Sequence, residues 1–318
     1  MAKDIYLGID TSCYTTSVAA IDTDGILVGE ARRILTVKEG KCGLMQSEMV
    51  FQHTRNLPEL VEAVLADKDY RLKAIAVSGY PRPIEDSYMP AFLAGRSVAR
   101  SLSAATGATL YTISHQENHM EAGIWSAKGP ESDRFLMLHA SGGTTDLLLA
   151  ERQENGRYKI TQVGGSIDLH AGQFVDRIGV ALGLQFPTGP ALEKLAQTAT
   201  EMVELPVSVR KLEASLSGPA TAAQRLLEAG ADGAAMARGV EHALAETFAR
   251  LLRNGAAQFN VRDVLFVGGV ASNQYMRKHV EEKLAKRRVR LWVPEARFSC
   301  DNSTGCAAFA WRMEQNRI

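Results

Sequence analysis

The sequence predicts a duplicated α/β fold with two lobes, and three observations support this prediction. The 318 residues are 46% hydrophobic and 23% charged, which is typical of a globular chain long enough for two cores. Strands of buried type alternate with amphipathic helices along the chain. A strand-turn-strand unit with a turn of small and hydroxylated residues occurs near the N-terminus and again after residue 134. Mixed sheets with helices on both sides, built twice, imply two lobes with a cleft between them.

The first half opens with an apolar strand that runs into a hydroxyl-rich turn, and a second apolar strand follows, so we expect a hairpin. Apolar spacing of three and four residues then predicts the helices, and short β-branched runs predict the remaining strands. In chain order we expect strands at 5–10 and 18–22 joined by the turn 11–17, a strand at 33–37, a helix at 46–67, a strand at 74–78, a helix at 89–105 and a strand at 108–113.

The second half begins the same architecture again, although little residue identity aligns between the halves. In chain order we expect a strand at 135–139, a turn at 140–145, strands at 146–151 and 158–163, helices at 172–182, 191–196, 220–229 and 234–255, a strand at 264–267, a helix at 274–287, a strand at 289–293 and a last helix after 302. We therefore expect one lobe at 1–110 and a second, with a helical insertion, at 111–301. The C-terminal helix at 302–318 is expected to pack back on the first lobe.

Charge, apolar segments and cysteine content indicate which partners, location and redox state to expect. Basic and acidic residues number 36 each, so no overall basic field attracts nucleic acid, and any RNA contact must be local. No segment has the length of apolar sequence that a membrane span or a signal peptide needs, which predicts a cytoplasmic protein without membrane contact. The four cysteines, Cys13, Cys42, Cys300 and Cys306, form no C-x-x-C pair, so we expect reduced thiols.

Three segments have the glycines and hydroxyls that suit an anionic or nucleotide ligand. The turns at 11–17 and 140–145 can point backbone N–H groups at phosphate oxygens, although Ser, Thr and Gly are also common in plain hairpins. The strand at 264–267 ends in Gly268 and Gly269 and opens a helix, where Asn273 is either a ligand contact or only a helix cap. Asp176 could accept hydrogen bonds from ribose hydroxyls, or it could be a solvated helix residue.

A metal site is the most specific chemical prediction. His115 and His119 lie four residues apart on one face of a helix that Ser114 can cap, and this spacing lets both imidazoles reach one metal. A lone helical histidine pair can also be structural, so further ligands are needed, and Asp301 and His139 are the candidates. Position 116 is Gln, so the H-E-x-x-H of zinc peptidases is absent. Such ligands suit iron, zinc or manganese.

Together these residues resemble the TsaD/Gcp family, the tRNA N6-adenosine threonylcarbamoyltransferases once described as O-sialoglycoprotein endopeptidases. The resemblance runs from Ile5 to about Trp311. It is carried, in the family's order, by the motifs at 8–13 (Gly-Ile-Asp-Thr-Ser-Cys), 115–119 (His-x-x-x-His), 141–145 (Ser-Gly-Gly-Thr-Thr), 164–168 (Gly-Gly-Ser-Ile-Asp), 182–190 (Leu-Gly-Leu-Gln-Phe-Pro-Thr-Gly-Pro), 268–273 (Gly-Gly-Val-Ala-Ser-Asn) and 301–302 (Asp-Asn).

The resemblance implies a duplicated actin/sugar-kinase/Hsp70-like (ASKHA) fold that transfers a threonylcarbamoyl group from its adenylate to the adenosine next to the tRNA anticodon. It implies one divalent transition metal, iron or zinc, and ATP or an acyl-adenylate as ligand. It also implies a smaller TsaB-like partner, although a homodimer is an alternative. By this resemblance the metal ligands are His115, His119 and Asp301, with His139 as a possible fourth, and the catalytic candidates are Asp10 and Ser12. The implied nucleotide contacts are Ser141, Gly142, Gly143, Thr144, Asp176, Gly189, Gly268, Gly269 and Asn273.

Departures from the family pattern point to a divergent paralogue. Tyr14 and Thr15 replace an acidic pair, Thr144 replaces a histidine, and Pro219-Ala220 ends a stretch whose lysine is missing. The usual Gly-Pro-Gly turn is replaced at 79–83. Two alternatives therefore stay open, a non-catalytic or regulatory relative that binds nucleotide and metal, and an ASKHA phosphotransferase that uses Asp10 or Asp168 with magnesium.

Overall fold

The computed structural model describes residues 2–37, 44–66 and 69–315, which form two compact units. The first unit comprises Met1–Lys128, Gln153–Tyr158 and Arg297–Ile318, and the second comprises Gly129–Arg152 and Lys159–Ala296. The first unit thus extends beyond the boundary expected at residue 110. The reason is that the helix following the last strand of its sheet packs on the C-terminal helix of the same unit.

The first unit is built on a five-stranded sheet in the order β3-β2-β1-β4-β5. The antiparallel hairpin expected at the start of the chain is present, and β4 and β5 add to it in parallel. The strands are β1 (Lys3–Asp10), β2 (Thr15–Asp22), β3 (Leu27–Ile34), β4 (Tyr70–Tyr80) and β5 (Thr109–Ser114).

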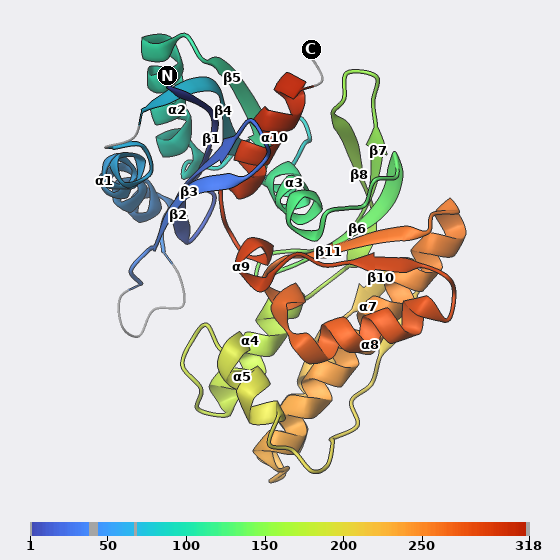
Figure 1. Ribbon diagram of the computed structural model, residues 1–318. Helices are drawn as coiled ribbons and strands as arrows, with labels where there is room; N and C mark the ends of the chain where they lie inside the picture. The colour runs from blue at the N-terminus through green and yellow to red at the C-terminus, as the bar shows by residue number, and fades with distance from the viewer. Residues whose placement is uncertain (1, 38–43, 67–68, 316–318) are drawn as a thin grey trace. The chain divides into compact units, whose positions relative to one another are not determined.

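Helices cover both faces of this sheet (Figure 1), and the alternation of side chains along β1 explains why. Ile5, Leu7 and Ile9 pack into a core with α1 and α2, whereas Tyr6 packs on the other face with Phe309 of α10. The helices of this unit are α1 (Gln46–Leu65), α2 (Phe92–Thr106), α3 (His115–Ala127) and α10 (Thr304–Gln315). Residues 316–318 of the expected C-terminal helix lie outside the described part of the chain, as does residue 67 of the helix expected at 46–67.

The strand predicted at 33–37 is wrong in position, because the third strand is Leu27–Ile34. A tight turn after β2 starts β3 early: the Asp22 carboxylate accepts hydrogen bonds from the backbone N–H groups of Asp24 and Ile26, and Gly25 has φ +77°. Side chains of β3 are partly or fully exposed, as on an edge strand, so the apolar alternation that reveals a buried strand is missing.

The second unit is built on a seven-stranded sheet in the order β12-β11-β6-β7-β8-β10-β9. The short strands β9 and β10 were not predicted. The strands are β6 (Arg134–Ala140), β7 (Thr145–Arg152), β8 (Tyr158–Ser166), β9 (Ser208–Arg210), β10 (Glu213–Ser215), β11 (Asp263–Val267) and β12 (Arg290–Trp292). The remaining helical elements are α4 (Ala171–Ala181), α5 (Gly189–Ala196), α6 (Ser217–Glu228), α7 (Gly233–Phe259), the 3-10 turn η1 (Gly269–Ser272), α8 (Gln274–Ala285) and α9 (Ala296–Ser299).

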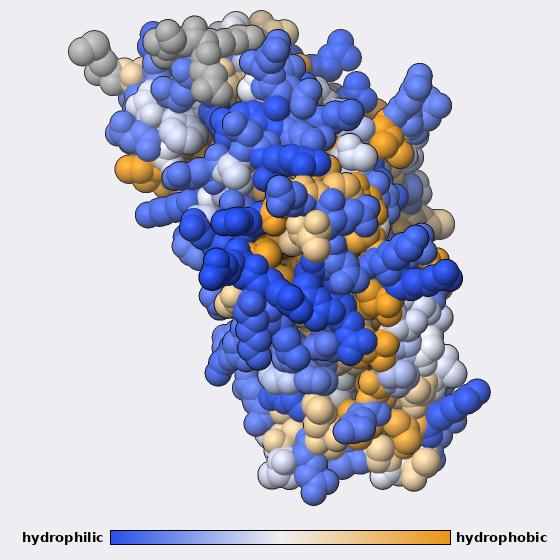
Figure 2. Space-filling model, turned by 90° about the vertical axis from the view of Figure 1, so that its right-hand side faces the viewer, coloured by the Kyte–Doolittle hydropathy of each residue, from blue (hydrophilic) through white to orange (hydrophobic). Residues whose placement is uncertain are grey.

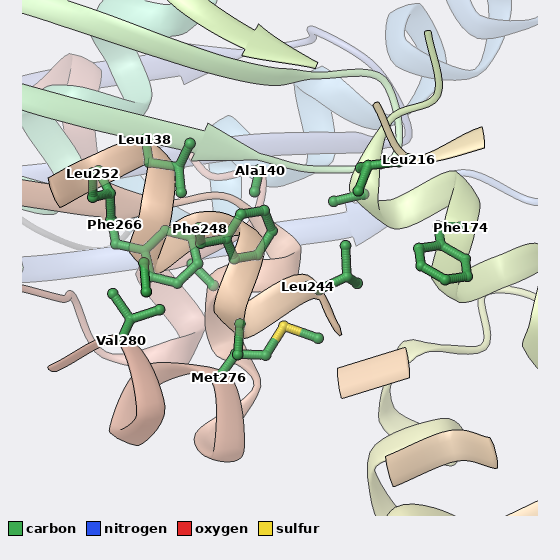
Figure 3. Close-up of a cluster of buried hydrophobic side chains, with 14 of the residues drawn as sticks. Leu138, Ala140, Phe174, Leu216, Leu244, Phe248, Leu252, Phe266, Met276 and Val280 are labelled. Atoms are coloured by element: carbon green, nitrogen blue, oxygen red, sulfur yellow. The ribbon is translucent and has the colours of Figure 1, made fainter. Parts of the chain in front are cut away.

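The core of the second unit lies between this sheet and its helices (Figure 3). Phe248 of α7 meets Phe266 of β11 edge to face, with ring centroids 5.4 Å apart, and Leu138, Met276 and Val280 surround the pair. Such a large buried cluster fixes the ends of β6 and β11, from which two of the glycine-rich segments start.

Hydrophilic side chains cover most of the face shown in Figure 2, with smaller apolar areas between them. Among the described residues no helix has both the length and the apolar character of a membrane span. No disulfide joins Cys13, Cys300 or Cys306 in the described residues, and Cys42 lies outside them. The cytoplasmic location stays a prediction.

Candidate metal centre and nucleotide loops

The helix that carries the histidine pair begins where the sequence predicts. Ser114 Oγ accepts a hydrogen bond from the Glu117 backbone N–H (3.1 Å), and Glu117 Oε2 accepts one from the Ser114 backbone N–H (2.6 Å). This reciprocal capping box satisfies two of the N–H groups that a helix start leaves without partners. It fixes α3 directly after β5, so His115 and His119 lie one turn apart on the same face.

The structure brings His115, His119 and Asp301 together, although more than 180 residues separate the histidines from the aspartate. The two Nε2 atoms are 3.2 Å apart, and Asp301 Oδ1 lies 3.4 Å from that of His119 and 3.6 Å from that of His115. One ligand atom from each residue fits within 4.8 Å, which is the only such group of three among the described residues. Two imidazoles and a carboxylate at this spacing fit a transition metal.

The electrostatics keep His115 and Asp301 in the protonation states that bind metal. Burial, together with the neighbouring His119, lowers the pKa of His115 to about 3, so its imidazole is neutral. Burial alone would raise the pKa of Asp301, but the hydrogen bond with His119 and the electrostatic interactions with the nearby histidines outweigh it and lower that pKa. A neutral imidazole and an ionised carboxylate are the ligating forms.

Asp10 and Ser12 lie beside this group. Ser12 Oγ donates a hydrogen bond to Asp10 Oδ2 (2.9 Å), while Asp10 Oδ1 lies 3.9 Å from Nδ1 of His115. The Asp10 side chain is fully buried, and burial raises its pKa to about 8. Asp10 thus lies beside His115 and Ser12 beside Asp10, and their expected catalytic role stays a prediction.

The loop after Ser12 contains Tyr14 and Thr15 in place of the family's acidic pair. Tyr14 packs in an apolar cluster with Leu35, Met49 and Ala91, and Thr15 is buried in β2. These two positions therefore supply no carboxylate to the histidine group.

The turn between β6 and β7 has the open glycines that an anion-binding loop needs. Ser141 Oγ accepts a hydrogen bond from the Gly143 N–H (3.3 Å), and a backbone hydrogen bond from Ser141 to Thr144 closes the turn. Gly142 and Gly143 are exposed, with no other atom within 4 Å of an added Cβ on their open sides. Their N–H groups, with the Ser and Thr hydroxyls, can approach phosphate oxygens closely.

The Gly268-Gly269 segment follows β11 in the same unit. Gly268 has φ +101°, and a Cβ there would lie 2.2 Å from the carbonyl oxygen of Ala140, so only glycine fits. Asn273 caps α8: its Oδ1 accepts a hydrogen bond from the Met276 N–H (2.9 Å), and its Nδ2 donates one to Glu241 Oε1 (2.6 Å). The cap interpretation of Asn273 is confirmed, and one amide hydrogen remains for a ligand.

Asp176, which we expect to contact ribose, holds a turn in this structure. Its Oδ1 accepts hydrogen bonds from the backbone N–H (2.8 Å) and the Oγ1 (3.1 Å) of Thr188, just before Gly189 opens α5. The second carboxylate oxygen can still face a ligand. The ribose contact stays a prediction for Asp176, as does the nucleotide contact for Gly189.

His139 and Asp168 are two further candidates, and they lie in different surroundings. His139 is buried at the end of β6, in the second unit, so its expected contribution to the metal stays a prediction. Asp168 accepts hydrogen bonds from the hydroxyls of Ser215 (2.6 Å) and Ser217 (2.5 Å). Although burial opposes it, these hydrogen bonds hold the pKa of Asp168 well below its usual range, which makes it a poor general base.

Several residues that complete these sites were not found from the sequence. Glu241, fully buried on α7, anchors the Asn273 amide and is paired with Arg238 at 2.6 Å, and burial raises its pKa to about 7. His53 of α1 lies between Thr16 Oγ1 (2.8 Å) and the Cys13 carbonyl oxygen (3.2 Å), which fixes the first loop. No local signal identifies the roles of these residues, because the contacts of Glu241 with Asn273 and of His53 with Thr16 and Cys13 span more than 30 positions.

Comparison with known proteins identifies similar sequences and folds. The family model described as TsaD, tRNA N6-adenosine threonylcarbamoyltransferase, matches residues 35–308. A tRNA N6-adenosine threonylcarbamoyltransferase of Thermus thermophilus is 32% identical over 312 residues, covering 97% of this chain and 93% of that protein.

Solved structures show the fold. HypF of T. kodakarensis aligns with a TM-score of 0.63 and 14% identity, over 98% of this chain and 48% of HypF. A ROK family glucokinase from Streptomyces griseus, solved with glucose and AMPPNP, aligns with a TM-score of 0.54 and 11% identity, over 96% of this chain and 98% of the glucokinase. The predicted ASKHA fold is therefore confirmed.

Proposed function

The chain belongs to the TsaD family of tRNA N6-adenosine threonylcarbamoyltransferases, and from this premise we propose that it transfers a threonylcarbamoyl group from an adenylate to an adenosine of tRNA. The acceptor in this proposal is the adenosine next to the anticodon. The observation that carries the proposal is the gathering of His115, His119 and Asp301 from distant parts of the chain into one metal-ligating group.

Each part of the chain has a role in this proposal. His115, His119 and Asp301 would hold one iron or zinc ion, which would supply a Lewis acid for the acyl-side oxygens of the adenylate and help to orient them. The N–H groups and hydroxyls of 141–144 bind its phosphate, with Gly268 and Gly269 giving close backbone approach and the Asn273 amide donating one hydrogen bond. Asp176 and Gly189 complete the nucleotide contacts, and His139 is a possible fourth metal ligand.

Asp10 and Ser12 are the residues that we propose to act near the reacting group. Asp10 is buried and its pKa is raised to about 8, so its ionised form is present near neutral pH and is a stronger base than an ordinary carboxylate. Ser12 keeps the carboxyl oriented through its hydrogen bond. The acceptor is the exocyclic amine of adenine: as the new N–C bond forms, the bond between the carbamoyl carbon and the phosphate oxygen of the adenylate breaks, and AMP leaves. The amine must lose a proton in this step, and the ionised form of Asp10 can take it.

The direct test is a transfer assay. The purified protein is given unmodified tRNA, threonine, bicarbonate, ATP and the enzyme that makes the adenylate, with and without a TsaB-like partner. We expect threonylcarbamoyladenosine in the tRNA digest by mass spectrometry, and none with a tRNA whose acceptor adenosine is replaced by guanosine. Without product under either condition, while the adenylate still binds, tRNA transfer would be abandoned as the function.

The two alternatives predict other results. A regulatory relative binds nucleotide and metal without turnover, and the absence of carboxylates at Tyr14 and Thr15 is the observation in its favour. A phosphotransferase would need magnesium and a phosphate acceptor, whereas two imidazoles favour a transition metal. The similar sequences are described as transferases, which favours the transferase over both alternatives. The TsaB-like partner and the homodimer stay predictions. Size-exclusion chromatography with the partner distinguishes a complex with the partner from a homodimer.

A further inference from the structure

The helix α3 has two faces with different tasks. His115 and His119 lie on one face, and Glu117 and Glu121 lie roughly 200° around the helix from them. Both glutamates are nearly fully buried, and each is paired with an arginine that comes from another part of the first unit. A buried carboxylate with a charged partner holds its position strongly, because breaking the pair leaves an uncompensated charge.

Arg157 lies at the junction of β5 and α3. Its Nη2 donates to Glu117 Oε1 (3.1 Å) and to the carbonyl oxygen of Thr112 (3.3 Å), the third residue before His115. Glu117 uses its other oxygen to cap the helix at Ser114. A single guanidinium group therefore connects the end of β5 with the first turn of α3.

Arg312 of α10 binds the next turn of α3. It forms a two-pronged ion pair with Glu121, with Nε 3.1 Å from Oε2, and it also donates to the carbonyl oxygen of Gly156. The Phe309 ring packs against both guanidinium groups, 5.2 Å from that of Arg157 and 5.5 Å from that of Arg312. These five side chains, Arg157, Arg312, Glu117, Glu121 and Phe309, are called the α3 clamp below.

We propose that the α3 clamp sets the rotation of α3 about its axis, and that Arg157 is a positioning residue for the metal site. This inference rests on the proposed metal site of His115, His119 and Asp301. When a helix rotates about its axis, a metal-ligating side chain on it is displaced sideways. A metal site tolerates changes of only about 0.2 Å in its metal–ligand distances. Outer residues that orient ligands change metal affinity by roughly 10- to 100-fold when they are lost.

The test compares Arg157→Met with a matched control elsewhere in the chain. Methionine keeps an apolar stem against Phe309 but removes the charge and both hydrogen bonds. Arg134→Met is the control, because Arg134 also donates to a carboxylate (Glu151, 3.0 Å) and to a carbonyl oxygen (Phe259, 2.9 Å) and also lies over a phenylalanine ring. Cobalt(II) is the probe, since its affinity is measured by titration and its visible absorption reports ligand geometry.

We expect Arg157→Met to bind cobalt about 10-fold or more weakly than the wild type and to shift the visible bands of the saturated protein. Arg157→Lys, which keeps the charge, should recover part of the affinity, and Arg134→Met should match the wild type in both measurements. If Arg157→Met fails to fold, Glu117→Gln takes its place, because glutamine retains the cap acceptor and loses the ion pair.

The outcomes separate this inference from the proposed function. If the wild type binds cobalt, His119→Ala does not, and Arg157→Met keeps the wild-type affinity and spectrum, the clamp does not position the site and only this inference falls. If the wild type binds no cobalt, or His119→Ala binds it equally well, the metal site itself is wrong and both fall.

Discussion

Gly305 lies where α10 crosses α3, and replacing it with alanine should force the two helices apart. An added Cβ would lie 1.9 Å from the carbonyl oxygen of Asn118, 2.6 Å from its Oδ1 and 2.7 Å from the backbone nitrogen of Ala122. All three atoms belong to α3, and two are backbone atoms that cannot rotate away. To reach van der Waals separation the helices must move apart by more than about 1 Å.

The cost of Gly305→Ala follows from these contacts. Overpacking of this kind costs about 1–3 kcal/mol. The shift also strains two buried hydrogen bonds of the Asn118 side chain, to the Asn302 carbonyl oxygen (2.6 Å) and from the Cys306 N–H (2.8 Å), each of which contributes about 1 kcal/mol. Alanine returns about 1 kcal/mol through its higher helix propensity. The free energy of unfolding should fall by about 2–4 kcal/mol.

The assay is urea unfolding followed by far-ultraviolet circular dichroism, with Gly218→Ala as the control. Gly218 lies in the first turn of α6, where an added Cβ has no atom within 4 Å, so this variant should be neutral or more stable by up to about 1 kcal/mol. A Gly305→Ala protein within about 0.5 kcal/mol of the wild type would show that α10 and α3 are not packed as closely as described.

Two further variants test other parts of the structure. Asn273→Ala should weaken adenine-nucleotide binding by about 1–3 kcal/mol in isothermal titration calorimetry, because Glu241 loses its amide donor and the ligand loses a hydrogen bond; an unchanged dissociation constant would remove Asn273 from the ligand contacts. Glu246 has its pKa lowered from 4.5 to about 2 by hydrogen bonds from His279, Arg250 and Lys283, although burial opposes the shift. The ionised Glu246 therefore stabilises the fold above pH 4.5, and this stabilisation is lost as the pH falls toward 2. After allowance for solvent screening, Glu246→Gln should lower the free energy of unfolding at pH 7 by about 1 kcal/mol. The difference should shrink progressively below pH 4.5 in a series of urea unfolding curves. An equal difference between the two proteins at pH 7 and pH 3 would contradict this assignment.

Local sequence signals were sufficient for the elements that carry the metal candidates. Ser114 before the histidine pair, with Glu117 three residues later, is the pattern of a capped helix, and the structure has that cap. The apolar run at 5–10 is a buried strand whose neighbours fill both faces of the sheet, as predicted. Such elements are set by residues within a few positions of one another, which is why a single sequence reveals them.

Other features depend on contacts that the sequence does not encode locally. The edge strand β3 is partly exposed and starts at a turn held by the Asp22 side chain, so its apolar pattern is weak. Arg157 and Arg312 look like ordinary surface arginines in the sequence, and only the fold brings them to the glutamates of α3. The contact between Asn273 and Glu241 likewise depends on the packing of α8 against α7.

The most direct test of the central claim is the metal content of the purified protein and two variants, measured by inductively coupled plasma mass spectrometry. His119→Ala removes the most buried histidine of the group, and His279→Ala removes a partly buried histidine that pairs with Glu246 instead. We predict roughly one iron or zinc ion per chain in the wild type and in His279→Ala, and nearly none in His119→Ala, with the circular dichroism spectrum unchanged. A folded His119→Ala protein that retains the wild-type metal content would contradict the claim that His115, His119 and Asp301 form the metal site.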